Sequence, residues 1–272
     1  MKKQLLTLAL SLCLVLGLST AATAVESDSI DVIVNASVID TPTPSQLIGG
    51  IAYVSYWPIV QALYPDATAV WQDGQSVVTA SGLTLTIKPG RNYLEVNGRC
   101  LYIPQGVQMF GSVPLVPARI LATALGANMA WDPVGCDVVI TAGSGPITSG
   151  DLFYDANDLY WLSRIIHAES GNQSLAGKIA VGNVVLNRVA SSRFPNTVYD
   201  VIFQRGQFTP ASSGTINRTP STESIAAAKL CLEGTNTAGS ALYFINARVS
   251  PNSWAARNRP YVATIGAHTF YA

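Results

Sequence analysis

The sequence has few charged residues and no excess of either sign. Charged side chains make up 12% of its 272 residues, and 16 basic groups balance 16 acidic ones. A nucleic-acid-binding chain carries a basic excess, and a disordered chain combines low hydrophobicity with high net charge. With 49% hydrophobic residues, this sequence fits neither class. It predicts a folded protein with no nucleic acid among its partners.

Long apolar runs are missing except at the N-terminus. There Lys2 and Lys3 precede the apolar run 5–18, and the small residues Ala22-Thr23-Ala24 follow it. This order is typical of a secretory signal peptide. The run is too short for a membrane span, which needs about 20 residues. We therefore expect residues 1–24 to be a signal peptide, and the mature protein to be secreted with no membrane span.

Cysteine and histidine are scarce, which limits metal and nucleophile chemistry. After the signal peptide, Cys100 and Cys136 are able to pair in an oxidising compartment, whereas Cys231 lies in an Ala-rich apolar run typical of a core. The two histidines, His167 and His268, are not part of an H-E-x-x-H motif. The sequence also has no P-loop or dinucleotide fingerprint, so we expect neither a metal nor a cofactor.

An internal repeat with an offset of 60 to 62 residues occupies the first half. Its two copies include residues 54–63 and 116–125, each followed by a tryptophan (Trp71 or Trp131) and a pair of valines. Each copy predicts a short strand, a helix of about ten residues and a hairpin. Turn signals join the predicted strands at Asp73-Gly74, Asn97-Gly98 and Pro133-Val134-Gly135.

The second copy carries a family resemblance. Residues Val116–Asp132 read V-P-A-R-I-L-A-T-A-L-G-A-N-M-A-W-D, and in tandem with the first copy they resemble the copper amine oxidase N-terminal-like domain. The first copy departs from that pattern at Trp57-Pro58, where an Arg-containing segment is usual. The resemblance implies an accessory, wall-binding α+β domain over residues 28–143. Residues 144–150, rich in Gly, Ser and Pro, predict a flexible linker.

The second half, residues 151–272, is predicted to be mainly helical, which makes the whole chain α+β. Polar residues with capping potential precede three helical segments: Asp155 or Asp158 before 159–170, Ser174 before 175–189, and Ser221 before a helix that ends at Glu233. Residues 206–219 are polar and broken by Pro and Gly, and we interpret them as a cleft-lining loop. Residues 241–246 and 268–271 are predicted to be extended.

Glu169 is the candidate catalytic residue. On the helix 159–170 it lies three and four residues beyond Ile166 and Ile165, so it continues the apolar stripe of Leu162 and these isoleucines. Burial raises the pKa of a carboxyl group, and a general acid working near neutral pH needs such a pKa.

Spacing alone leaves a second interpretation open. The helix can end here, so that Glu169 turns into water or pairs with Arg164 or Lys178. The other acids of the second half have structural explanations, at helix starts, on the exposed side of a short helix, or at a helix end: Asp151, Asp155, Asp158, Asp200, Glu223 and Glu233. Glu169 is the acid without one.

A second resemblance covers residues 151–272. The runs Trp161–Asn172 and Gly177–Val189 resemble the SleB/CwlJ-type spore cortex-lytic cell wall hydrolases, with further matches at Arg193–Thr197, Gln207-Phe208, Ala241–Phe244, Asn246, Trp254 and Gly266–Phe270. The resemblance implies a lysozyme-like domain that acts on peptidoglycan in the cell wall or spore cortex, with Glu169 as its catalytic glutamate. One departure is Ala267, where Asn commonly precedes the final His.

Four further residues suit a saccharide groove, because they are polar or aromatic and lie in loop or extended segments: Gln207, Tyr243, Asn246 and His268. Hydrolysis of a glycosidic bond usually uses two carboxylates. No acid follows Glu169 in the segment Ser170–Ser174. A single carboxylate favours lytic transglycosylation, in which the C6 hydroxyl of N-acetylmuramic acid replaces water.

Two rival functions stay open. An N-acetylmuramoyl-L-alanine amidase would need a metal site or nucleophile, which the motifs above do not supply. A non-catalytic wall-binding or spore protein would need no acid group at all. Peptidoglycan is the expected partner in every case.

Overall fold

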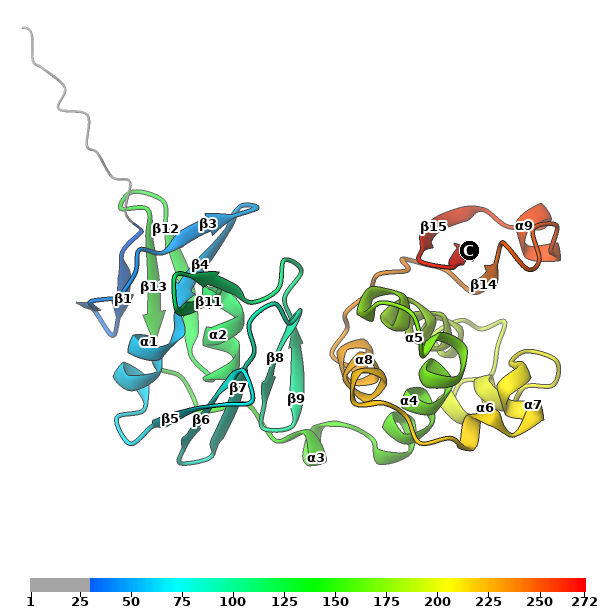
Figure 1. Cartoon of the computed structure of the whole chain (residues 1–272), viewed down its shortest axis with the longest axis horizontal. Coiled ribbons are helices and arrows are strands. Elements are labelled where there is room, and N and C mark those ends of the chain that lie inside the picture. Colours follow the sequence, from blue (N-terminus) through cyan, green and yellow to red (C-terminus); the bar gives the residue numbers. More distant parts are fainter. Residues whose placement is uncertain (1–29) are drawn as a thin grey trace, which may run out of the picture.

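The computed structural model describes residues 30–272, so the predicted signal peptide, residues 1–24, lies outside the described residues. Figure 1 shows a strand-rich N-terminal part (residues 30–149) beside a mainly helical C-terminal part (residues 150–272). The prediction of an α+β protein is confirmed. No helix within residues 30–272 has the length and apolar character to cross a bilayer.

The N-terminal part consists of three sheets and two short helices. The sheets have the strand orders β12-β13-β1-β2, β10-β11-β4-β3 and β5-β6-β7-β8-β9. Their elements are β1 (Val32–Val34), β2 (Ser37–Val38), β3 (Gln46–Ile48), β4 (Ile51–Ser55), α1 (Tyr56–Leu63), β5 (Thr68–Gln72), β6 (Gln75–Ala80), β7 (Leu83–Ile87), β8 (Tyr93–Val96), β9 (Arg99–Tyr102), β10 (Gln108–Phe110), β11 (Val113–Pro117), α2 (Ala118–Ala124), β12 (Asn128–Asp132) and β13 (Asp137–Thr141).

The internal repeat is confirmed and has a structural meaning. The order β4-α1-β5-β6 recurs as β11-α2-β12-β13, with helices of eight and seven residues where about ten were predicted. In the antiparallel pair of β4 and β11, Val54 lies opposite its own repeat equivalent, Val116. The two copies therefore meet at the centre of one sheet, about an approximate two-fold axis.

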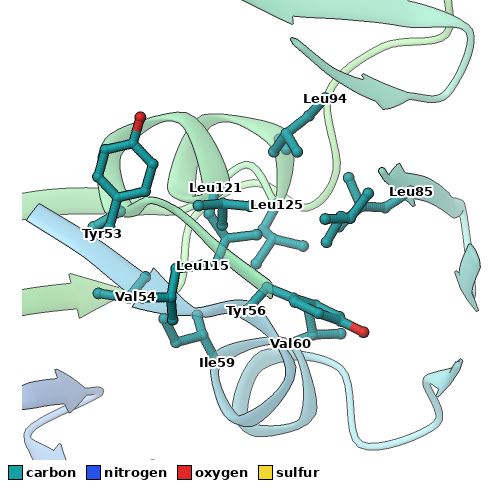
Figure 2. Packing of buried hydrophobic residues seen from close by; sticks show 14 of the residues in the cluster. Tyr53, Val54, Tyr56, Ile59, Val60, Leu85, Leu94, Leu115, Leu121 and Leu125 are labelled. Atoms are coloured by element: carbon teal, nitrogen blue, oxygen red, sulfur yellow. The ribbon is translucent and has the colours of Figure 1, made fainter. Parts of the chain in front are cut away.

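Both copies contribute to one buried core. Figure 2 shows Val54 and Ile59 of the first copy facing Leu115 and Leu121 of the second. Burial of this kind stabilises a fold by roughly 25 cal/mol per Å² of apolar surface. Residues of both copies belong to this one cluster, so the core forms where the two copies pack together.

The predicted turns form where the sequence places them. Asp73 and Gly74 have φ values of 50° and 70°, and Asn97 and Gly98 have 48° and 78°. Two consecutive left-handed residues make the tight hairpin turn that Asp-Gly and Asn-Gly favour. In the third turn the left-handed residue is Cys136, at φ 59°.

Cys100 and Cys136 are not paired. All three cysteines of the described residues are free thiols, and Cys100 is buried on β9 whereas Cys136 lies in the β12–β13 turn. Burial raises the pKa of Cys100 to about 12. Cys231 is buried as the sequence predicts.

Residues 144–150, the expected flexible linker, make hydrogen bonds to the N-terminal part. Asn97 Nδ2 donates a hydrogen bond to the carbonyl of Ile147 at 2.9 Å, and Gly150 N donates to the carbonyl of Asn97 at 2.8 Å. Ile147 also packs against the N-terminal core. The backbone groups of this segment form hydrogen bonds with the N-terminal part, and these bonds hold the segment along it. Composition alone does not reveal such contacts.

The C-terminal part is a helical bundle with one small sheet of order β14-β16-β15. Its elements are α3 (Gly150–Phe153), α4 (Ala156–Ser170), α5 (Leu175–Val189), α6 (Val198–Phe203), α7 (Thr209–Ser213), the 3₁₀ turn η1 (Thr215–Asn217), α8 (Thr222–Leu232), β14 (Tyr243–Asn246), α9 (Trp254–Asn258), β15 (Tyr261–Ile265) and β16 (His268–Tyr271). The predicted loop 206–219 therefore contains two short helical segments.

The two parts are in direct contact. Strand β9 packs against α8, and Tyr93 and Cys100 share a buried cluster with residues of the C-terminal helices. Figure 1 shows α8 on the side of the bundle that faces β9, and the small sheet at one end of the bundle.

Candidate active site

Glu169 lies near the C-terminal end of α4. This helix starts where the Asp155 side chain accepts hydrogen bonds from the backbone N–H groups of Asn157 and Asp158, which decides between the two predicted caps. Ile165 and Ile166 are fully buried. Glu169 follows them on the same face, as its spacing predicts.

The Glu169 carboxyl is half-buried, and burial raises its pKa above the usual value. The two ion pairs within residues 30–272 join other side chains. Lys178 is bound to Glu223 at 2.6 Å, and the Arg164 guanidinium lies 3.5 Å from the ring centre of Tyr160. Neither cation is therefore the ion-pair partner of Glu169, and desolvation of the carboxylate is uncompensated.

Two contacts tie the end of α4 to other elements. His167 Nδ1 lies 3.4 Å from Ser224 Oγ and 3.5 Å from the backbone N of Ser221, at the start of α8. In the loop after α4, Gln173 Oε1 accepts a hydrogen bond of 3.0 Å from the backbone N of Ala267, in the β15–β16 turn. The end of α4, the start of α8 and the small sheet thus converge.

Asn246 and His268 face each other in the small sheet. They are direct partners in the antiparallel pairing of β14 with β16. His268 is 7% exposed, because its ring packs edge-on against Phe244 and Phe270. Burial lowers the pKa of His268, and its Nδ1 is buried without a hydrogen-bond partner.

Tyr243 points to the other face of β14, because side chains alternate along a strand. There its ring lies 5.6 Å from that of Trp254 and within cation–π distance of Arg188 and Arg259. Burial lowers the pKa of Arg188 to about 10. Trp254 packs in this cluster and is still 53% exposed.

Gln207 is exposed in the loop between α6 and α7. The four predicted saccharide-binding residues therefore divide into three locations. Asn246 and His268 form one pair, Tyr243 belongs to an aromatic–arginine cluster, and Gln207 stands apart.

Two polar residues near this region have contacts that were not predicted. Gln173 links the loop after α4 to the small sheet, and Lys178 is only 2% exposed. A lysine inside the apolar run of the helix 175–189 is a signal that could have indicated a buried lysine held by an acidic partner. Gln173 has no comparable sequence signal. Among residues 30–272, no three His, Cys, Asp or Glu side chains cluster to hold a metal ion.

Comparisons with known proteins match both parts of the chain. Residues 172–271 match the family model described as Cell Wall Hydrolase, and residues 33–140 match the Copper amine oxidase N-terminal domain. A spore cortex-lytic enzyme of Bacillus cereus is 36% identical over 117 residues, which cover 43% of this chain and 45% of that protein. The corresponding enzyme of Oceanobacillus iheyensis is 31% identical over 128 residues, covering 47% and 46%.

A solved structure, the catalytic domain of the germination-specific lytic transglycosylase SleB from Bacillus anthracis, is 34% identical. The match covers 46% of this chain and 100% of that domain, with a TM-score of 0.42. The sequence matches show a Cell Wall Hydrolase domain in the C-terminal part of the chain, over residues 172–271. The chain spans less than half the length of the curated relatives it matches.

Proposed function

We propose that the C-terminal part cleaves the glycan strands of peptidoglycan, with Glu169 as general acid and base. The observation that carries this proposal is the half-buried Glu169 carboxyl, whose pKa is raised by burial and which lacks an ion-pair partner. A carboxylic acid that keeps its proton near neutral pH can protonate the oxygen of a leaving sugar. The relatives named as spore cortex-lytic enzymes support the same chemistry.

The reaction is a lytic transglycosylation. Glu169 donates its proton to the glycosidic oxygen as the bond to C1 of N-acetylmuramic acid breaks. The C6 hydroxyl of that sugar then attacks C1, and the Glu169 carboxylate takes the hydroxyl proton. The product is a 1,6-anhydro sugar, and the acid is regenerated. No second acid lies between residues 170 and 174 to activate a water.

The predicted saccharide-binding residues take two roles in this proposal. Gln207 and Asn246 have enough exposure to contact a sugar. The rings of Tyr243 and His268 are packed in aromatic clusters, so we assign them positioning roles.

We also propose that the protein is exported and acts in the spore cortex or cell wall. In this scheme residues 28–143 form the accessory domain and residues 151–272 the catalytic domain. The names of the relatives support the cortex, and the sequence of residues 1–24 supports export.

The test is mass spectrometry of muropeptides released from purified sacculi by the wild type and by Glu169→Gln. We expect 1,6-anhydro ends from the wild type and no release by the variant. Asp158→Asn is the matched control, because it removes a carboxylate from the first turn of the same helix. It should release the same products as the wild type.

Three results would overturn the proposal. Release by Glu169→Gln equal to the wild type removes the catalytic role of Glu169. Cleaved amide bonds indicate an amidase, and binding to sacculi without any release indicates a wall-binding protein. Reducing ends in place of anhydro ends would keep Glu169 as the acid and replace the transglycosylation by hydrolysis.

A further inference from the structure

A cleft of about 350 Å³ lies between the two parts of the chain. The turn between β7 and β8 lines one side with Lys88, Arg91 and Asn92, and the starts of α5 and α8 line the other with Leu175 and Thr222. A second cleft, of about 360 Å³, shares Arg91 and Thr222 with the first. The two clefts adjoin and form one groove, which we call the interdomain groove.

The interdomain groove concentrates cations that have no ion-pair partner. Lys88 and Arg91 are two of the four basic residues of the N-terminal part, and Lys229 on α8 adds a third. All three are half-buried, yet the two ion pairs of residues 30–272 engage other side chains. A partly desolvated charge without a counter-charge is unfavourable, so these cations favour an anionic ligand.

Two carboxylates also line the interdomain groove. Glu223 is neutralised by Lys178 at 2.6 Å, whereas Glu95 has no such partner among the described residues. Tyr93 and Leu175 add apolar surface. The groove thus has several cations, one available carboxylate and apolar walls. Such a lining suits a zwitterionic peptide better than a polyanion, because the peptide carries charges of both signs.

We propose that the interdomain groove binds the stem peptide of peptidoglycan through its carboxylates. This inference rests on the proposed function, because it makes the stem peptide of the glycan substrate the ligand. Stem peptides carry several carboxylates and, in their diamino acid, an amino group that can donate a hydrogen bond to the Glu95 carboxylate. A teichoic acid carries a phosphate in every repeat, and the unpaired Glu95 carboxylate repels such a chain.

The location of the groove links the peptide to the candidate active site. Thr222, which lines the groove, starts α8. Its neighbours Ser221 and Ser224 contact His167, which is two residues before Glu169 on α4. A peptide held in the groove would orient the muramic acid that carries it, and the N-terminal part would thereby contribute to substrate binding.

The first experiment measures binding of a soluble stem tetrapeptide to the full chain by calorimetry. The variant Lys88→Gln/Arg91→Gln removes two cations of the groove. Hydrogen bonds to charged groups are stronger than those between neutral groups, so we expect the double variant to bind the tetrapeptide at least about tenfold more weakly. Arg91→Lys keeps the charge and should bind nearly as well as the wild type. Arg119→Gln is the matched control, because Arg119 lines a different cleft of the N-terminal part.

The second experiment compares turnover on two substrates. On sacculi stripped of phosphate polymers, the double variant should show a raised KM and an unchanged kcat. On glycan strands whose peptides have been removed by an amidase, it should equal the wild type. The melting temperatures of all variants are measured alongside.

Three outcomes overturn the inference. The first is equal tetrapeptide binding by the double variant and the wild type. The second is an equal loss of turnover by the double variant on both substrates. The third is a raised KM of the double variant that is seen on whole sacculi and disappears on sacculi stripped of phosphate polymers. The last result would indicate teichoic acid as the ligand. The calorimetric test needs no turnover, so a chain that binds the peptide and cuts no glycan would overturn the proposed function alone.

Discussion

Arg99 on β9 and Glu233 at the end of α8 form a two-point ion pair between the N-terminal and C-terminal parts. Arg99 Nε donates to Glu233 Oε1 at 2.8 Å, and Nη2 donates to Oε2 at 2.7 Å. The side chains are 13% and 9% exposed. Tyr154 donates a further hydrogen bond to Oε1, and Phe153 stacks under the guanidinium. The pair fixes how α8 sits against the N-terminal sheet.

Arg99→Ala should therefore destabilise the whole chain. It leaves the Glu233 carboxylate buried without its partner, which costs about 3 kcal/mol of unfolding free energy. Tyr154→Phe removes one hydrogen bond and should cost about 1 kcal/mol. Urea unfolding measures both. A loss below about 1 kcal/mol for Arg99→Ala would mean that the pair behaves like an exposed salt bridge.

Glu169→Gln should stabilise the protein at alkaline pH. Burial raises the folded-state pKa of Glu169 above its unfolded value, so ionisation weakens the folded state as pH rises through that folded pKa. The variant cannot ionise, so its melting temperature should exceed that of the wild type at pH 8. The difference should disappear below about pH 4, where the carboxyl is protonated in both states. A variant less stable than the wild type at pH 8 would contradict this.

His268 should make stability fall on acidification. Burial lowers its folded-state pKa below the unfolded value, so its contribution is complete above about pH 6.5 and is lost as pH falls through the folded pKa. His268→Phe packs between Phe244 and Phe270 and removes this dependence. Melting temperatures from pH 7 to pH 4.5 test it. An acid-side slope of His268→Phe equal to that of the wild type would contradict this.

Gly182→Ala should disturb the packing beneath Glu169. A Cβ at this position on α5 would lie 2.6 Å from Cys231 Sγ and 2.8 Å from Ile166 Cδ1. Overpacking of this kind costs about 1–3 kcal/mol. Because Ile166 lies one turn before Glu169, glycan release should fall as well. Cys231→Ala makes room for the methyl group, so the double variant should recover stability relative to Gly182→Ala. Failure to recover would show that the clash with Ile166 dominates.

The local elements were largely predictable because their signals are local. The cap at Ser174 and the helix 175–189 follow from a capping side chain and an uninterrupted helical run, and both are confirmed. The Asp-Gly and Asn-Gly turns follow from the left-handed conformation that these residues tolerate. The strand β15 and helix α9 were missed, although Ser253 caps α9 by accepting a hydrogen bond from the backbone N of Ala256.

The candidate site was predictable only in part. The helical period places Glu169 on the buried face of α4, but the period does not say whether a cation reaches it. Lys178 does not pair with Glu169, because it forms an ion pair with Glu223, which is 45 residues away in the sequence. The separation of Tyr243 from Asn246 follows from strand alternation once β14 is known, whereas the sequence showed only an extended segment.

The sequence by itself determined the secondary structure of most elements, the tandem repeat and the identity of the isolated acid, because these depend on neighbours within a few residues. Only the tertiary structure decided the free state of Cys100 and Cys136, the anchoring of residues 144–150 and the meeting of Arg99 with Glu233. Each of these depends on groups brought together from distant parts of the chain, and local propensity carries no information about such distances.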